Sequence, residues 1–241
     1  MIPMPRWVRT AGFVLAAALI AAPASAQIVQ GFHMGVGVFY PRQFDSRDPD
    51  DVLVQDLTFA DPLEFSIDNF RSGMIFGEWT ADVGSHLSFG VGVSYYSDRV
   101  PSRYLGLMND IDGSDIAQDL RLKMIPITGM VRFMPFGSPS TFQPYVGIGV
   151  AAIPWRYNES GQFIDVNGDI FTDRFTATGT AFGPVLAGGF RAPVGGDIYA
   201  LTMEWKYQFA TGNTGGSANN FLGDKIDLSG GTLNFGFLVR F

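Results

Sequence analysis

The segment Tyr199-Ala-Leu-Thr-Met-Glu-Trp-Lys-Tyr-Gln-Phe209 alternates strictly between two kinds of side chain. Its odd-numbered positions are apolar or aromatic, whereas its even-numbered positions are small, polar or charged. Successive side chains of a β-strand point to opposite faces. The segment therefore predicts a strand with one hydrophobic and one polar face. This is the pattern of a barrel strand whose outer face meets lipid and whose inner face lines a polar interior.

The same period of two recurs along the chain, more clearly in some segments than in others. The expected strands cover residues 31–40, 72–82, 86–96, 119–134, 143–156, 174–191, 198–210 and 232–241. Segment 119–134 breaks the pattern, because Arg121 and Lys123 share the parity of apolar residues further along. Either a β-bulge near Ile125-Pro126 shifts the phase, or the two cations stand above the membrane, where parity is not enforced.

The connections between these segments alternate in length. Long connections cover 41–71, 98–118, 157–173 and 211–227, and short ones cover 82–86, 135–142 and 192–197. Outer-membrane barrels have short periplasmic turns and longer extracellular loops. The sequence thus predicts an all-β fold, an eight-stranded antiparallel up-and-down transmembrane β-barrel with short periplasmic turns and long extracellular loops.

The composition of the 241 residues supports this class of protein. Only 16% of the residues are charged, against about 25% in soluble proteins. The 30 glycines and 22 phenylalanines do not suit a helical bundle. The chain has no cysteine, which excludes disulfides and thiolate metal sites, and its net charge of −7 argues against a nucleic-acid partner.

The N-terminal residues 1–26 have the pattern of a cleavable signal peptide. Arg6 and Arg9 precede an apolar run at 11–22, and Ala24-Ser-Ala26 is a typical cleavage site. An N-terminal membrane anchor is the alternative, but the run is shorter than the ~20 residues of a spanning helix. We therefore expect export and a barrel domain over residues 27–241.

Six charged residues fall on the inward parity of the expected strands: Glu78, Arg132, Arg191, Glu204, Lys206 and Arg240. The interior of an eight-stranded barrel is just wide enough for side chains to fill. Buried charges need partners, so these six are expected to form a lumen charge network. The same residues suit either a rigid polar plug or a narrow, gated pore, and the sequence leaves both open.

Aromatic residues gather near the expected strand ends, as the aromatic girdle of a membrane barrel requires. We assign Trp79, Trp155 and Trp205 to this girdle. The alternative is that they are core aromatics of a soluble β-sandwich.

The order of several short motifs resembles the family of small eight-stranded outer-membrane β-barrels, the OmpA-like, OmpW-like and opacity-protein-like group. The motifs are Leu233-Asn-Phe-Gly-Phe-Leu-Val-Arg-Phe241, Pro144-Tyr-Val-Gly-Ile-Gly-Val150, Ile125-Pro-Ile127 with Arg132-Phe133, and Glu204-Trp-Lys-Tyr207. The resemblance implies a monomer in the cell outer membrane, in contact with lipid and lipopolysaccharide. It also implies that the β-barrel assembly machinery recognises the last strand through Phe235, Phe237 and Phe241.

Catalytic and metal sites are not expected. His86-Leu-Ser88 partly matches the His-x-Ser-Asn motif of lipid A deacylases, but position 89 is Phe and the next acid is Asp98. The acidic loops lack the glycine and glutamate spacing of an EF-hand, although their carboxylates could bind divalent ions that bridge lipopolysaccharide phosphates. We therefore predict no cofactor and no resident metal.

Four functions compete. The first is a non-enzymatic integral outer-membrane protein with an envelope-structural or surface-contact role. The second is a small pore for hydrophobic or small polar solutes. A lipid A-modifying enzyme and a soluble lipocalin-like carrier are weaker alternatives, and the carrier conflicts with the continuous apolar outer face.

Overall fold

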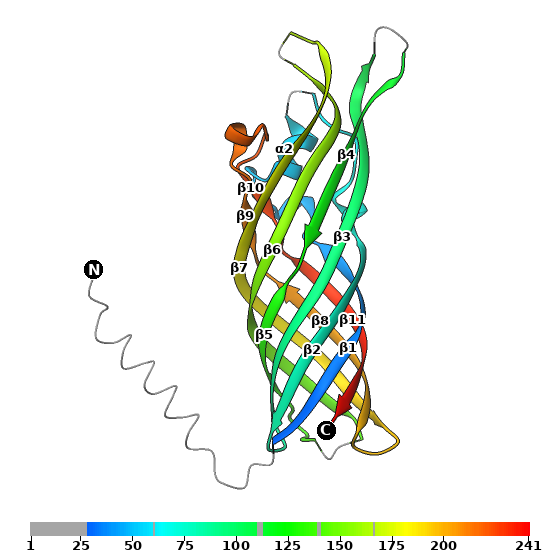
Figure 1. The fold of residues 1–241 in the computed structure, drawn as a ribbon, viewed down its shortest axis with the longest axis vertical. Coiled ribbons are helices and arrows are strands. Elements are labelled where there is room, and N and C mark those ends of the chain that lie inside the picture. The colour runs from blue at the N-terminus through cyan, green and yellow to red at the C-terminus, as the bar shows by residue number, and fades with distance from the viewer. Residues whose placement is uncertain (1–27, 60, 110–112, 139–140, 166) are drawn as a thin grey trace, which may run out of the picture.

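The computed structural model describes residues 28–59, 61–109, 113–138, 141–165 and 167–241, and the expected signal peptide lies outside them. Figure 1 shows a tall barrel of tilted strands, in which the first strand begins and the last strand ends near the same rim. We call this rim the turn end and the opposite rim the loop end. No helix of the described residues is long and apolar enough to cross a membrane.

The barrel wall is a single antiparallel sheet. Its strands are β1 (Ile28–Pro41), β2 (Ser72–Val83), β3 (Leu87–Met108), β4 (Asp115–Met124), β5 (Ile127–Phe133), β6 (Gln143–Ile164), β7 (Ile170–Val194), β8 (Tyr199–Gln208) and β11 (Gly230–Arg240). β4 and β5 both lie between β3 and β6, every other wall strand pairs with the next wall strand along the chain, and β1 also pairs with β11, which closes the ring. Because β4 and β5 are two halves of one strand position, the ring has eight strands, which confirms the predicted fold.

The interruption between β4 and β5 is not a bulge. The pairs Tyr96–Met124 and Val93–Ile127 lie on one unbroken register with β3. The ladder is interrupted because Pro126 has no N–H to donate, although its carbonyl still accepts from Ser94 N at 2.9 Å. The predicted bulge is therefore wrong, and Arg121 instead faces outward, as the other alternative required.

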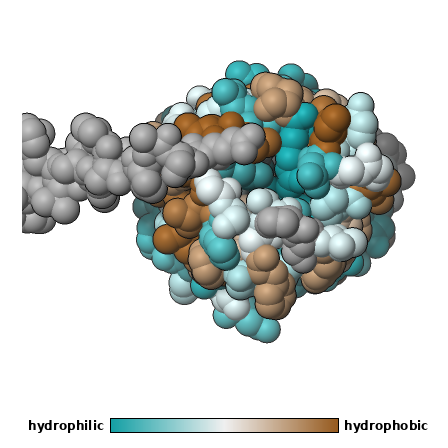
Figure 2. Space-filling view, turned by 90° about the horizontal axis from the view of Figure 1, so that it is seen from below, coloured by the Kyte–Doolittle hydropathy of each residue, from teal (hydrophilic) through white to brown (hydrophobic). Residues whose placement is uncertain are grey.

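The alternation of the expected strands matches the two faces of the wall. Leu201, Phe235 and Val150 are 55%, 50% and 67% exposed on the outside, whereas Glu204 and Asn234 are buried inside. Figure 2 views the turn end, where hydrophobic residues lie at several places around the rim and hydrophilic ones occupy much of the face between them. The hydrophobic parity thus faces outward over the lower part of the barrel.

Three strands are much longer than the sequence pattern indicated. β3, β6 and β7 continue toward the loop end, so the expected long connections 98–118 and 157–173 are largely paired strands. In this upper part the polarity of the wall is inverted: Val100 and Leu120 are buried inside, while Arg99 is exposed outside. The apolar side chains move from the outer to the inner face although the strand register does not change. A rule that expects apolar side chains on the lipid-facing side therefore ends these strands too early.

The first long connection folds into the mouth of the barrel instead of standing outside it. It contains η1 (Phe44–Ser46), α2 (Val52–Thr58) and η2 (Ile67–Phe70), and the last connection contains β9 (Thr211–Asn213), η3 (Gly216–Asn219) and β10 (Lys225–Asp227). Val52, Leu53 and Phe70 are almost fully buried in one apolar core with the inward side chains of the upper wall. We call this folded connection the plug; the sequence predicts it only as a long extracellular loop.

A buried carboxylate fastens this plug to the last connection. Asp51 caps α2 by accepting from Leu53 N, and it pairs with the Arg47 guanidinium at 3.0 Å. Asp51 also accepts from the backbone N–H of Asp227, while Arg47 Nη2 donates to the Asp227 carbonyl at 2.8 Å. Arg47 and Asp51 are both buried, so this junction fixes the plug at the loop end.

Candidate functional site

The Arg132 guanidinium lies at the centre of the lower lumen, between carboxylates from two other strands. Its Nη2 donates to Glu78 Oε1 and to Glu204 Oε2, both at 2.9 Å, and its Nε donates to Glu204 Oε2 at 3.0 Å. The Tyr145 hydroxyl donates to the same Glu204 oxygen at 3.0 Å. Arg132 is only 1% exposed and the two carboxylates are 4% or less. The network therefore joins β5, β2 and β8 across the barrel.

Lys206 and His33 lie beside this centre. Lys206 Nζ lies 3.3 Å from Glu204 Oε1, and His33 Nδ1 lies 3.4 Å from Glu78 Oε2. The other ring nitrogen of His33 is 2.6 Å from Thr202 Oγ1. These contacts carry the lumen network around to β1.

A second cluster closes the turn end. Arg191 Nη1 lies 3.0 Å from Asp82 Oδ1, and Arg240 Nε lies 3.6 Å from Asp82 Oδ2. Arg191 Nη2 also donates to Ser88 Oγ at 3.0 Å, and Arg240 Nη2 donates to Gln143 Oε1 at 2.8 Å. The six predicted charges thus lie inside the barrel in two groups rather than one.

Sequence reasoning missed the partners that make each group. Asp82 was placed in a turn, yet it is the buried carboxylate between two arginines. Neither His33 nor Tyr145 is among the six residues predicted for the network, yet His33 contacts Glu78 and Tyr145 contacts Glu204. On β6, Tyr145 has the same parity as Gly147 and the opposite parity to the outward Val146. This alternation in the sequence indicates that Tyr145 points inward.

The tryptophans do not form one girdle. Trp79 and Trp205 are 42% and 45% exposed on the outer face, but Trp155 is buried inside the barrel. A Cβ on Gly212 would lie 2.5 Å from the Trp155 ring, so the indole packs closely beneath β9. The assignment of Trp155 to the girdle is therefore wrong. Phe235, Phe237 and Phe241 are exposed on the outer side of the last strand and just beyond it, and their role in assembly stays a prediction.

The motif at His86 does not assemble a catalytic pair. His86 lies in the turn before β3, with its Nδ1 2.6 Å from Ser85 Oγ and its ring stacked on Phe133. Ser88 faces the lumen, where it accepts from Arg191. The two side chains therefore lie on different faces of the wall.

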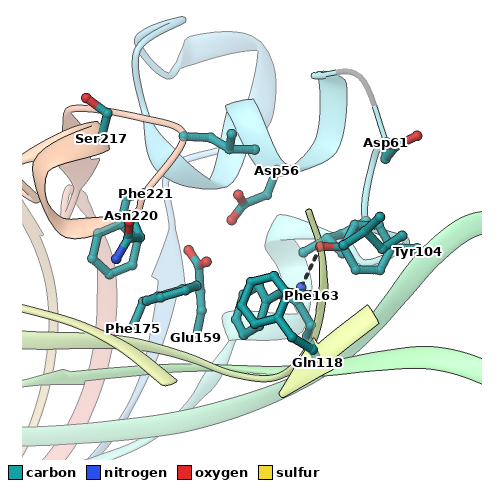
Figure 3. A pocket seen from close by; sticks show the side chains of 14 residues that line it. Asp56, Asp61, Tyr104, Gln118, Glu159, Phe163, Phe175, Ser217, Asn220 and Phe221 are labelled. Carbon is teal, nitrogen blue, oxygen red and sulfur yellow. Dashed lines mark hydrogen bonds between the residues drawn. The ribbon is translucent and has the colours of Figure 1, made fainter. Parts of the chain in front are cut away.

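A cavity of about 380 Å³ lies at the loop end, between α2, η3 and the upper wall. Figure 3 shows the carboxylates of Asp56, from α2, and Glu159, from β6, pointing into the same space. A third acid, aromatic and aliphatic side chains and a few polar groups form the rest of the lining, which includes Asp61, Leu63, Tyr104, Gln118, Phe163, Phe171, Phe175 and Phe221. Burial raises the pKa of Asp56 well above its usual range, and the nearby Glu159 carboxylate adds to this effect.

A basic groove runs along the outside of the upper wall. A hollow of about 420 Å³ is lined by polar and charged residues of four neighbouring strands: Arg99, Asp119, Arg121, Arg156, Asn158, Ser160, Arg174 and Thr176. Arg99 lies directly opposite Arg121 in the β3–β4 pair, where its guanidinium also pairs with Asp119, and Lys123 lies opposite Arg156 in the β4–β6 pair. Like charges directly opposite each other destabilise a sheet, so this groove favours an anion.

We expect Arg132→Ala to lower the free energy of unfolding by about 3–5 kcal/mol, because it removes the guanidinium that Glu78 and Glu204 share and leaves Glu204 with Lys206 alone. Urea unfolding of the barrel in lipid vesicles measures the change. Arg103→Ala is the control, since Arg103 pairs with Glu64 and Asp115 at the exposed surface, where ion pairs contribute little. Equal stability of the two variants would show that the lumen network does not hold the walls together.

The comparisons agree with this architecture. The model of the family described as outer membrane protein beta-barrel domain matches residues 11–241. The chain is similar in structure to the outer membrane protein OprG from Pseudomonas aeruginosa, with a TM-score of 0.52, 14% identity, and coverage of 90% of this chain and 97% of OprG. No curated protein matches the chain by sequence.

Two other small barrels are similar with lower scores. Neisserial surface protein A has a TM-score of 0.44 and 14% identity, and covers 89% of this chain and 96% of its own. Ail of Yersinia pestis, solved in complex with the heparin analogue sucrose octasulfate, has a TM-score of 0.43 and 12% identity, and covers 89% and 99%. With the family match over nearly the whole length, the chain belongs to the outer-membrane β-barrel family.

Proposed function

We propose that this protein is a non-enzymatic, non-conducting barrel that serves the envelope through its structure and its surface contacts. The observation that carries the proposal is the filled lumen. The two charge clusters occupy the turn end and the middle, and the plug of the first connection packs against buried residues such as Tyr96 and Ile153 above them. A solute moving along the axis would have to displace both layers.

The pore alternative is tested by conductance. We expect the purified protein in a planar bilayer to give no single-channel steps. Glu204→Ala should also be silent, because Tyr145 and the plug still fill the lumen on either side of the missing carboxylate. A general porin reconstituted in parallel shows that the membranes report channels. Regular steps from the wild-type protein would overturn the proposal.

The surface contact that the structure supports best is with lipopolysaccharide. The basic groove lies just above the apolar band, since Tyr95 and Val93 are exposed on β3 only a few residues before Arg99. Lys123 Nζ sits 5.1 Å from the Tyr95 ring, at the boundary between the two regions. Arginines bind phosphate oxygens through two parallel hydrogen bonds. Phosphorylated head groups of the outer leaflet therefore match this groove in charge and in position along the barrel axis.

We expect lipid A to raise the thermal unfolding midpoint of the reconstituted protein, and the double variant Arg121→Gln/Arg156→Gln to lose most of that gain. Arg103→Gln is the matched control, since Arg103 lies further up β3, outside the lining of the groove. Dephosphorylated lipid A and inorganic phosphate form the other arms. An equal gain from dephosphorylated lipid A, or in the double variant, would contradict a phosphate contact, and an equal gain from inorganic phosphate would contradict a lipid site.

A further inference from the structure

The cavity at the loop end holds buried acceptors that no donor satisfies. Among the described residues, Glu159 Oε1 and Gln118 Oε1 have no hydrogen-bond partner, although the two residues are only 5% and 4% exposed. Both residues line the cavity. Buried polar groups are normally hydrogen-bonded, so these two oxygens indicate a site for a molecule that donates hydrogen bonds.

The cavity also holds two buried carboxyl groups, those of Asp56 and Glu159, without a cationic partner. Asp56 is 4% exposed, and the Tyr157 hydroxyl donates to its Oδ2 at 3.4 Å. No lysine, arginine or histidine of the described chain forms an ion pair with Asp56 or Glu159. Burial raises the pKa of both groups, that of Glu159 to about 8, because an unpaired buried charge is costly. A cation bound beside them would favour release of a proton and would pair with the carboxylate that forms.

The rest of the lining favours an organic cation over a metal ion. Phe163 packs edge-to-face on Phe175 with ring centroids 4.6 Å apart, and it stacks on Phe171 at 5.7 Å. Ca²⁺ takes about six to eight oxygen ligands, whereas aromatic rings attract ammonium groups and bury apolar chains. The volume of about 380 Å³ is that of a small-molecule pocket.

We propose that this cavity binds a small organic ammonium ion from the external medium, with its nitrogen donating to Glu159, Asp56 and Gln118 and its apolar part against the phenylalanines. The cavity opens at the loop end, which in this family faces the outside of the cell. The inference does not depend on whether the lumen conducts or on the basic groove, which lies on the outer face of the wall.

The test uses 2-phenylethylammonium as the probe and 2-phenylethanol as its neutral analogue, titrated into the full barrel in zwitterionic lipid nanodiscs by calorimetry. We expect Glu159→Gln to weaken binding of the ammonium probe at least tenfold, with Asp56→Asn acting in the same direction. Asp173→Asn is the matched control, because it removes one acid from the exposed part of β7. It should stay within twofold of the wild type.

Thermal unfolding of each variant shows that the barrel is intact, and Glu159→Gln keeps the side-chain volume, so loss of folding is not expected. Phe175→Ala should weaken the same probe severalfold by opening one wall of the pocket. Two results would overturn the proposal: equal affinity of the wild type and Glu159→Gln for the ammonium probe, or heats for 2-phenylethanol as large as those for 2-phenylethylammonium.

Discussion

The Arg132 guanidinium, held between Glu78 and Glu204, ties opposite walls of the barrel together, and the surrounding sequence makes room for it. A Cβ on Gly90 would lie 2.4 Å from Glu78 Oε1 and 2.7 Å from Arg132 Nη1. A Cβ on Gly147 would lie 3.1 Å from Arg132 Cγ. Because these inward-facing glycines have no side chain, they leave the space that the ion pairs occupy. A barrel of this size has no room for both larger side chains and a buried network.

The lumen is divided into two chemically different halves. Charged groups in the lower half are buried with partners, which is the condition under which charge is tolerated inside a protein. In the upper half the wall turns its apolar side chains inward, and the first connection supplies the apolar residues that cover them, fastened by Arg47 and Asp51. The loop-end cavity differs from both halves, because Asp56 and Glu159 are buried there without a cation.

Much of the fold could be predicted because lipid enforces alternation. Every segment that faces the membrane, such as 199–209, carries the pattern in its own sequence. The assignment failed where that constraint ends: β3 and β6 continue as strands with inverted polarity, and Trp155 faces inward beneath β9. The plug could not be predicted from composition. The eight acidic residues of the first connection indicate an exposed loop, and they hide the apolar residues Val52, Leu53 and Phe70 that form its core.

The site could be predicted in part for the same reason. Parity alone placed Arg132 and Glu204 inside, but parity does not tell which residues meet across a lumen. The position of Asp82 between two arginines depends on the tilt and stagger of the whole ring. Neither the loop-end cavity nor the basic groove has a local motif, since each draws its residues from several distant segments.

The central claim, that Arg132 is locked in a water-poor network that closes the lumen, is tested most directly by NMR exchange of its side-chain Nε proton. The account predicts that this proton exchanges with water much more slowly than that of the exposed Arg103, and that Glu204→Gln speeds it up. Equally rapid exchange for the two arginines would mean that water fills the centre of the barrel, and it would contradict the account.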